Sequence, residues 1–269
     1  MINSSDPTYI MESGNEGERL ENKTDPVETE RQLKLVGLEP GMKALDAGAG
    51  TGAVARVMAK IVGADGKVTA FDASENRLSQ GKKLAMDAGL DNMIFKSGDI
   101  MSPPFPNGEF DFVWSRFVFE YLSDPETAMD RLTDLVVPGG RLVVGDLDGN
   151  AIFHDGMDRD LEDTLHKILN SFQNDFDPYA GRKLYRRFYQ RGFKEIQVDC
   201  FPHYVYAGVV PKDHLSNWEG KLSGLRTHGV KVLGSSEDYD RFSERFLGFL
   251  KSPDTFTYSM LFLVSGIKP

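Results

Sequence analysis

The feature that most constrains this fold is a short apolar run that leads directly into a glycine-rich turn and then a helical pattern. The segment ALDAGAGTG covers residues 44–52. Glycines let the backbone pass against a ligand where any Cβ would collide. Gly48, Gly50 and Ala53 satisfy the dinucleotide fingerprint G-x-G-x-x-G/A, and Asp72 lies about 20 residues beyond Gly52, where a ribose-binding acid belongs. The turn therefore predicts a nucleotide-type cofactor without choosing which one.

The rest of the chain alternates short apolar runs with helical patterns, which is typical of a parallel sheet with crossover helices. After a helix at 27–38, we expect strands at 43–48, 67–73, 92–99, 111–117 and 141–147. Helices are expected at 52–62, 74–88 and 125–137. Residues 148–269 add helices at 157–172, 181–191, 212–222 and 237–251, and strands at 195–201 and 257–266.

Charge and cysteine content narrow the function. The chain has 31 Lys and Arg against 41 Asp and Glu, a formal net charge of -10, which disfavours a nucleic-acid partner. The single cysteine, Cys200, is expected in a buried strand, and it allows no internal disulfide and no thiolate metal cluster, so we expect no metal. Because no signal-peptide pattern or membrane-length apolar run occurs, we expect a cytoplasmic protein without a membrane span. Whether the protein forms a homo-oligomer stays open.

Two carboxylates bear on the choice of cofactor. Asp46 lies two residues before Gly48, an awkward neighbour for the pyrophosphate of NAD but a useful one for the ammonium and sulfonium of S-adenosylmethionine (SAM). Asp99 follows the third predicted strand, where its carboxylate can accept the adenine amino group while Ile100 offers its backbone N–H. Both residues favour SAM.

These motifs together carry a family resemblance. ALDAGAGTG, AFDAS, SGDI, FDFVWSRFVFEYL and PGGRLVV resemble, in order and spacing, the successive motifs of class I SAM-dependent methyltransferases over residues 40–147. The segment 178–198 resembles a subgroup of small-molecule methyltransferases related to those of ubiquinone and menaquinone biosynthesis. The resemblance implies an α/β fold: a Rossmann-like seven-stranded mixed sheet with an antiparallel last strand, helices on both faces and a helical cap.

The resemblance and the predicted elements together give an expected division of the chain. Residues 1–40 form an N-terminal arm and helix, and 41–201 form the SAM-binding core, with 150–176 as a candidate lid. Residues 202–256 form a helical cap insertion, because that stretch is too long for a hairpin loop, and 257–269 form the final core strand.

Carried over residue by residue, the resemblance implies a cofactor site built from five segments. Its expected members come from the N-terminal arm, the glycine turn, and the ends of the second, third and fourth strands: Tyr9, Arg19, Asp46, Gly48, Ala49, Gly50, Gly52, Asp72, Ala73, Arg77, Gly98, Asp99, Ile100, Ser115, Arg116 and Phe117. The expected cofactor is SAM, with S-adenosylhomocysteine as product.

The acceptor site is less strongly marked. His154, together with Asp146 and Asp148, follows the fifth predicted strand at the carboxyl edge where open α/β sheets bind ligands. His154 is the candidate for a general base that deprotonates an acceptor, the alternative being a solvated loop histidine, and His203 and His214 are weaker candidates. Aromatic residues are expected either to wall an apolar pocket or to form ordinary cap core: Phe153, Phe172, Phe176, Phe201, Tyr204, Tyr206 and Trp218.

The sequence thus predicts transfer of a methyl group to O, N or C of a small-molecule acceptor by in-line displacement. Two alternatives remain. A nicotinamide-dependent oxidoreductase can use the same glycine turn, although no Tyr-x-x-x-Lys directly follows the fourth or fifth predicted strand. A SAM-binding sensor or a non-methylating enzyme would keep the cofactor site without the methyl transfer.

Overall fold

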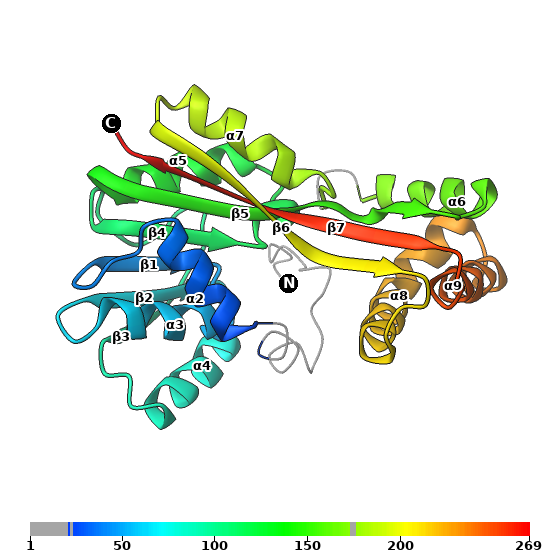
Figure 1. The fold of residues 1–269 in the computed structure, drawn as a ribbon, viewed down its shortest axis with the longest axis horizontal. Helices are drawn as coiled ribbons and strands as arrows, with labels where there is room; N and C mark the ends of the chain where they lie inside the picture. Colours follow the sequence, from blue (N-terminus) through cyan, green and yellow to red (C-terminus); the bar gives the residue numbers. More distant parts are fainter. Residues whose placement is uncertain (1–20, 22–23, 173–175) are drawn as a thin grey trace, which may run out of the picture.

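One mixed sheet organises the chain, and a computed structural model describes it over residues 21, 24–172 and 176–269. The strand order is β3-β2-β1-β4-β5-β7-β6 (Figure 1). Neighbouring strands from β3 to β5 run parallel, whereas β7 lies antiparallel between β5 and β6. The predicted seven-stranded sheet with an antiparallel last strand is confirmed. The strands are β1 (Lys43–Ala47), β2 (Lys67–Asp72), β3 (Met93–Ser97), β4 (Phe110–Arg116), β5 (Val136–Asp155), β6 (Lys194–Ala207) and β7 (Phe256–Ile267).

Helices cover both faces of the sheet, as predicted. One face packs against α2 (Pro26–Leu35), α3 (Ala53–Val62) and α4 (Glu75–Asp87), and the other against α5 (Pro125–Leu135) and α7 (Ala180–Gln190). Successive strand residues point to opposite faces, so each strand feeds both cores. On β4, for example, Phe112 and Trp114 enter the first core and Val113 the second.

Three further helices form a separate apolar cluster. They are α6 (Arg159–Asn170), α8 (Lys212–Leu233) and α9 (Ser236–Leu250), and their inward faces bury Leu165, Trp218 and Phe246. Figure 1 shows these helices around the far ends of β5, β6 and β7, which reach well beyond the carboxyl ends of β1–β4. We call α6, α8 and α9 the helical cap.

Two strands are much longer than predicted. The expected strands 141–147 and 195–201 correspond to β5, which continues to Asp155, and β6, which continues to Ala207. The reason is long-range pairing, because β7 continues alongside both strands as far as its first residue, Phe256, which pairs with Asp155 and Ala207. The turn-like residues after Asp148 do not end β5. They shift its register with β7 between Asp148 and Phe153, and the strand continues beyond them.

The prediction that Cys200 is buried was wrong, because this residue is exposed. It lies on β6, the edge strand of the sheet, where alternate side chains face opposite sides. Phe201 points to the covered side and is buried, whereas Cys200 and Val198 point away from it. Over the described ranges, no group of three or more His, Cys, Asp or Glu side chains is arranged to hold a metal ion. None of the described helices has the length and apolar character that a membrane span requires.

Candidate functional site

The glycine turn between β1 and α3 passes close to other parts of the chain. Gly48, Gly50 and Gly52 have φ values of 83°, 56° and 73°, in the left-handed region that favours glycine. A Cβ on Gly48 would lie 2.3 Å from Cγ2 of Val118. The backbone N–H groups of Gly48 and Ala49 both donate to the carbonyl oxygen of Phe71, at 2.8 and 3.0 Å, which holds the turn against the end of β2.

Asp72 closes one side of this turn at the carboxyl end of β2. Its Oδ2 accepts from the Gly50 N–H at 2.7 Å, and its Oδ1 accepts from the Ser74 N–H at 2.9 Å. Arg77 of α4 donates from Nη2 to the same Oδ1 at 3.2 Å. The carboxylate is therefore oriented by the glycine turn and by α4, in the place where the resemblance expects a ribose-binding acid. Ala73, also predicted for the site, lies directly between Asp72 and Ser74.

Asp46 lies beneath the turn and is only 3% exposed. Burial raises the pKa of this carboxyl to about 7, with Asp72 adding repulsion and Arg116 acting in the opposite direction. Within the described part of the chain, its Oδ2 is buried and accepts no hydrogen bond. A buried acceptor of this kind is costly unless a donor reaches it, so the chemistry here suits a cationic or N–H-bearing ligand group.

Arg116 is the last residue of β4 and Phe117 follows it. Strand β4 lies on one side of β1, which carries Asp46, and β2 lies on the other. Burial lowers the pKa of Arg116 to about 10, and its Nη1 donates to Oε1 of Gln32 on α2 at 3.0 Å. Phe117 has a φ of 61°, unusual for a residue with a Cβ, and its ring lies 5.1 Å from the Arg116 guanidinium carbon. Ser115, just before them, is fully buried. This corner is thus tightly built around the fourth strand end.

The segment after β3 lies beside the end of β2. Gly98 donates its N–H to the carbonyl oxygen of Asp72 at 3.1 Å, and a Cβ on Gly98 would lie 2.8 Å from the ring of Phe71. Asp99 is exposed and accepts from the Met101 N–H at 2.9 Å. Ile100 packs against the second core cluster. The structure therefore brings the predicted adenine segment next to the predicted ribose residue.

The N-terminal segment also reaches the glycine turn. Thr51 donates from Oγ1 to Oε1 of Glu21 at 2.5 Å, and Arg56 of α3 forms an ion pair with the same carboxylate. The two N-terminal residues predicted for the site, Tyr9 and Arg19, lie outside the described residues, and Glu21 was not among the predicted residues.

An apolar pocket lies between this corner and the helical cap. It contains about 880 Å³ of space not filled by atoms, part of it open to solvent. Its lining comes from η1 (Phe119–Tyr121), β5, β6 and the three cap helices, and includes Phe172, Trp218 and Phe246. The pocket adjoins the glycine turn through one short segment, because Val118 packs on Gly48, while Glu120 and Tyr121 line the pocket.

The predicted aromatic residues divide between this pocket and the surrounding core. Phe172, Phe176 and Trp218 line the pocket. Tyr204 and Tyr206 stack on each other with ring centroids 5.1 Å apart within the cap cluster, Phe153 stacks on Tyr258, and Phe201 belongs to the first core. His203 lines the pocket with its ring 5.5 Å from that of Phe117, whereas His214 bonds the hydroxyl of Tyr206 at 2.6 Å.

The structure argues against His154 as the general base. It lies on β5 rather than in a loop, and it is absent from the pocket lining. Its Nδ1 is 2.9 Å from Oγ1 of Thr257 and its Nε2 is 3.3 Å from the carbonyl oxygen of Ala151, so both ring nitrogens are engaged within the protein. Burial lowers its pKa to about 4. These contacts describe a neutral histidine that holds β5 to β7.

Sequence reasoning did not single out Glu120, which the structure places in the pocket wall. Glu120 is 2% exposed and lies beside Asp146, whose Oδ2 accepts from the Glu120 N–H at 3.0 Å. Burial and the neighbouring Glu120 charge raise the pKa of Asp146 well above its usual range. The available signal was an acidic residue inside the apolar run FVFEYL at a strand end. Asp148, by contrast, is paired with Arg182 at 2.8 Å.

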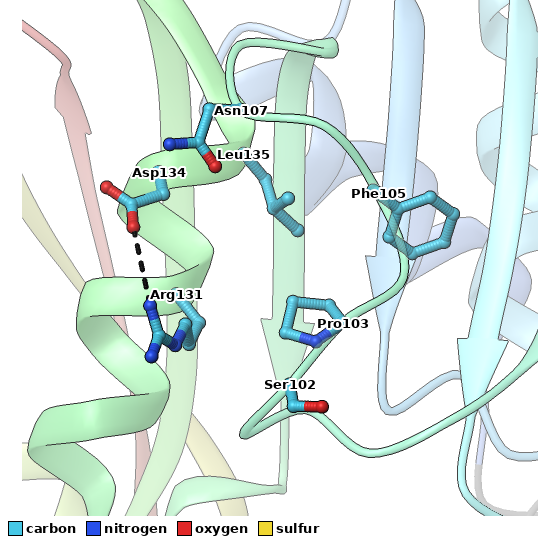
Figure 2. A pocket seen from close by; sticks show the side chains of 7 residues that line it. All are labelled: Ser102, Pro103, Phe105, Asn107, Arg131, Asp134 and Leu135. Atoms are coloured by element: carbon cyan, nitrogen blue, oxygen red, sulfur yellow. Dashed lines mark ion pairs between the residues drawn. The ribbon is translucent and has the colours of Figure 1, made fainter.

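A second pocket lies between α5 and the segment after β3. Figure 2 shows Pro103 and Phe105 on one side and Arg131 and Asp134 of α5 on the other, the latter two forming an ion pair at 3.9 Å. Its lining includes none of the residues predicted to bind the cofactor. It is therefore separate from the site described above.

Comparison with known proteins finds a family match within the core. Residues 45–144 match the family described as Methyltransferase domain. The stretch from β1 into β5 is therefore similar to a methyltransferase domain. It is 31% identical over 153 residues to the ubiquinone/menaquinone biosynthesis C-methyltransferase UbiE of Ectopseudomonas mendocina, covering 56% of this chain and 55% of that protein. It is 37% identical over 113 residues to the demethylmenaquinone methyltransferase of Staphylococcus aureus, covering 42% of this chain and 46% of that protein. The chain thus matches about half the length of these curated relatives.

Solved structures share the fold over most of the chain. A SAM-dependent methyltransferase from Aquifex aeolicus superposes with a TM-score of 0.52 at 20% identity, covering 98% of this chain and all of that one (100%). The [4+2]-cyclase SpnF superposes with a TM-score of 0.56 at 19% identity, covering 91% of this chain and 81% of that one. The same architecture is thus found in proteins named for different reactions, so the activity must be argued from the site.

Proposed function

We propose that this chain binds SAM at the glycine turn and transfers its methyl group to a small, largely apolar molecule held under the helical cap. The observation that carries the proposal is the junction at residues 117–121. There, Val118 packs on Gly48 of the cofactor turn, and Glu120 and Tyr121 line the apolar pocket. One short segment thus contacts both regions, the cofactor turn and the acceptor pocket, that a methyl transfer must bring together.

The residues of the turn fit SAM better than a dinucleotide. The buried, unpaired Oδ2 of Asp46 can accept from the ammonium group, whereas it would repel a pyrophosphate. Asp72 would accept from the ribose hydroxyls, and Gly98, Asp99 and Ile100 would hold the adenine. Gly48, Ala49, Gly50 and Gly52 would line the methionine part, with Ser115, Arg116 and Phe117 closing the donor side and Ala73 and Arg77 bordering the ribose.

When bound, SAM supplies a methyl group on a sulfonium that reacts by in-line displacement. The protein's part is to hold the acceptor in line and to exclude water, without a covalent intermediate. The aromatic lining from the cap supports both tasks, since it offers flat apolar surfaces around the pocket. The net charge of -10 supports a small molecule over a nucleic acid as acceptor.

Incubation with methyl-labelled SAM and pooled small metabolites tests the proposal. We expect label in a low-molecular-weight apolar product from the wild type and much less from Asp72→Ala. Label that appears mainly in protein or RNA would contradict the small-molecule acceptor. SAM that binds with no labelled product would favour the alternative, a SAM-binding sensor or a non-methylating enzyme.

A further inference from the structure

Glu120 is a buried acidic residue in the wall of an otherwise mainly apolar pocket. Hydrogen bonds hold both backbone polar groups of this residue. Its N–H donates to Oδ2 of Asp146 at 3.0 Å, and its carbonyl oxygen accepts from the Asp177 N–H at 2.7 Å. It belongs to the 3₁₀ turn η1, two residues after the Val118 side chain that packs on the glycine turn. A carboxylate here lies between the cofactor turn and the pocket interior.

Both carboxylate oxygens of the neighbouring Asp146 accept backbone hydrogen bonds, Oδ2 from the Glu120 N–H at 3.0 Å and Oδ1 from the Leu147 N–H at 2.8 Å. Asp146 is fully buried on β5 and lies outside the pocket lining, whereas Glu120 is part of that lining. This arrangement leaves Glu120 as the carboxylate that meets a bound molecule.

Other charged and titratable groups surround this pair. On the side of the pocket, β6 contributes His203 and Tyr204, and α8 contributes Lys221. On the side of the sheet, α7 packs against η1, and three of its basic side chains pair with other carboxylates: Arg182 with Asp148, Lys183 with Asp177, and Arg187 with Glu126.

We propose that Glu120 is a catalytic residue that binds a hydroxyl group of the acceptor and accepts its proton. This inference rests on the proposed function. The proton moves from the acceptor O–H to the Glu120 carboxylate, and the electron pair left on oxygen forms the new bond to the methyl carbon. The bond between that carbon and the sulfonium sulfur breaks, and its electron pair stays on sulfur. Charge and atoms balance without any further reactant.

The lining also defines the class of acceptor. The aromatic side chains Phe172, Phe176, Trp218, Phe242 and Phe246 suit a flat apolar frame. Because Glu120 is an acceptor of hydrogen bonds, a hydroxyl on that frame is bound, whereas a carboxylate at the same place is repelled. We infer a hydroxylated apolar acceptor, with an amine in place of the hydroxyl as an outcome of the test.

A shape-matched set of probes tests the binding step on the full chain. Ligand-detected NMR titrations would compare 2-naphthol, 2-methylnaphthalene, 2-naphthylamine and 2-naphthoate at pH 7. A hydrogen bond to a charged group corresponds to about tenfold or more in affinity, so the wild type should prefer 2-naphthol over 2-methylnaphthalene by about that factor, with 2-naphthoate weakest. Equal binding of the first two probes, or tighter binding of 2-naphthylamine than of 2-naphthol, would overturn the hydroxyl assignment.

Variants then assign the preference to Glu120. Glu120→Gln should reduce the preference to within about threefold, since a neutral hydrogen bond is weaker. Glu126→Gln, a more exposed carboxylate outside the pocket, should behave as the wild type. An undiminished preference in Glu120→Gln would refute the role of this residue, and the wild-type titration decides even if the variant does not fold.

The proton transfer has a separate readout once labelling identifies an acceptor. Glu120→Gln should lower kcat by about a hundredfold or more while the Kd for SAM is unchanged. Wild-type turnover in this variant would refute the inference alone. Failure of the wild type to bind SAM would instead refute the proposed function, and the probe titrations would remain interpretable.

Discussion

Binding of SAM should depend on pH through Asp46. In the ligand-free protein the pKa of this buried carboxyl is about 7, so at pH 5 it is almost always protonated. Contact with an ammonium group favours the carboxylate and returns its pKa to below 5. Between pH 7 and pH 5, the Kd for SAM should therefore rise about fiftyfold, or about 2.3 kcal/mol, because binding must first remove the proton.

Calorimetry measures both the affinity and the proton. At pH 6, titrations in two buffers of different ionisation enthalpy should show release of about one proton per SAM bound, falling towards zero by pH 8. Asp46→Asn should bind more weakly at pH 7 and lose the pH dependence. Asp99→Asn is the matched control, because Asp99 is exposed and the variant should keep the wild-type dependence. A wild-type Kd that is the same at pH 5 and pH 7 would refute the placement of Asp46 against the ammonium.

The same shift affects stability. A carboxyl whose pKa is raised on folding stabilises the protein fully below its unfolded pKa, and this contribution is lost as pH rises through the folded value. The ligand-free wild type should therefore lose free energy of unfolding between about pH 4 and pH 7, on the order of 4 kcal/mol from this group alone. Urea denaturation of the wild type and Asp46→Asn at both pH values checks the sign, and a wild type that gains stability relative to the variant would contradict it.

Three further substitutions test the site. Asp72→Ala should weaken SAM binding by about 1–3 kcal/mol in calorimetry, and unchanged affinity in a folded variant would remove its ribose role. Gly48→Ala should lower Tm and abolish SAM binding, because its Cβ would lie 2.3 Å from Val118 at a φ of 83°; normal values of both would show that the close approach is dispensable. His154→Ala should cost about 1–3 kcal/mol of unfolding free energy in urea, with no rate loss that higher pH rescues. A pH-rescued rate loss would restore it as the base.

The core of the fold was predictable because its signals are local. The glycine turn, the acids at strand ends and the alternation of strands and helices each occupy a few consecutive residues, and the structure has them near their predicted positions. Asp46 could be singled out because its distance from Gly48 along the chain is short and fixed. The burial that raises its pKa could not, because it depends on α2, on Arg116 and on the packing of the whole sheet.

The acceptor side was harder because its contacts are distant in sequence. The length of β5 and β6 depends on pairing with β7, about 100 and 50 residues later along the chain. Residues 148–156 lie between a predicted strand and a predicted helix, so a loop was predicted there, and that loop suggested an accessible base at His154 where the structure has a strand. Glu120 was overlooked because an acid in an apolar run becomes meaningful only when the cap helices, which follow it in sequence, form the other walls of its pocket.

The most direct test of the account is a calorimetric titration of the wild type at pH 7 with SAM and, separately, with NAD. The residues of the glycine turn predict SAM binding with one site per chain, loss of affinity in Asp72→Ala and Asp46→Asn, and at least a hundredfold weaker binding of NAD. Tight binding of NAD without binding of SAM would contradict the assignment of Asp46 and Asp72, and with it the proposed methyl transfer.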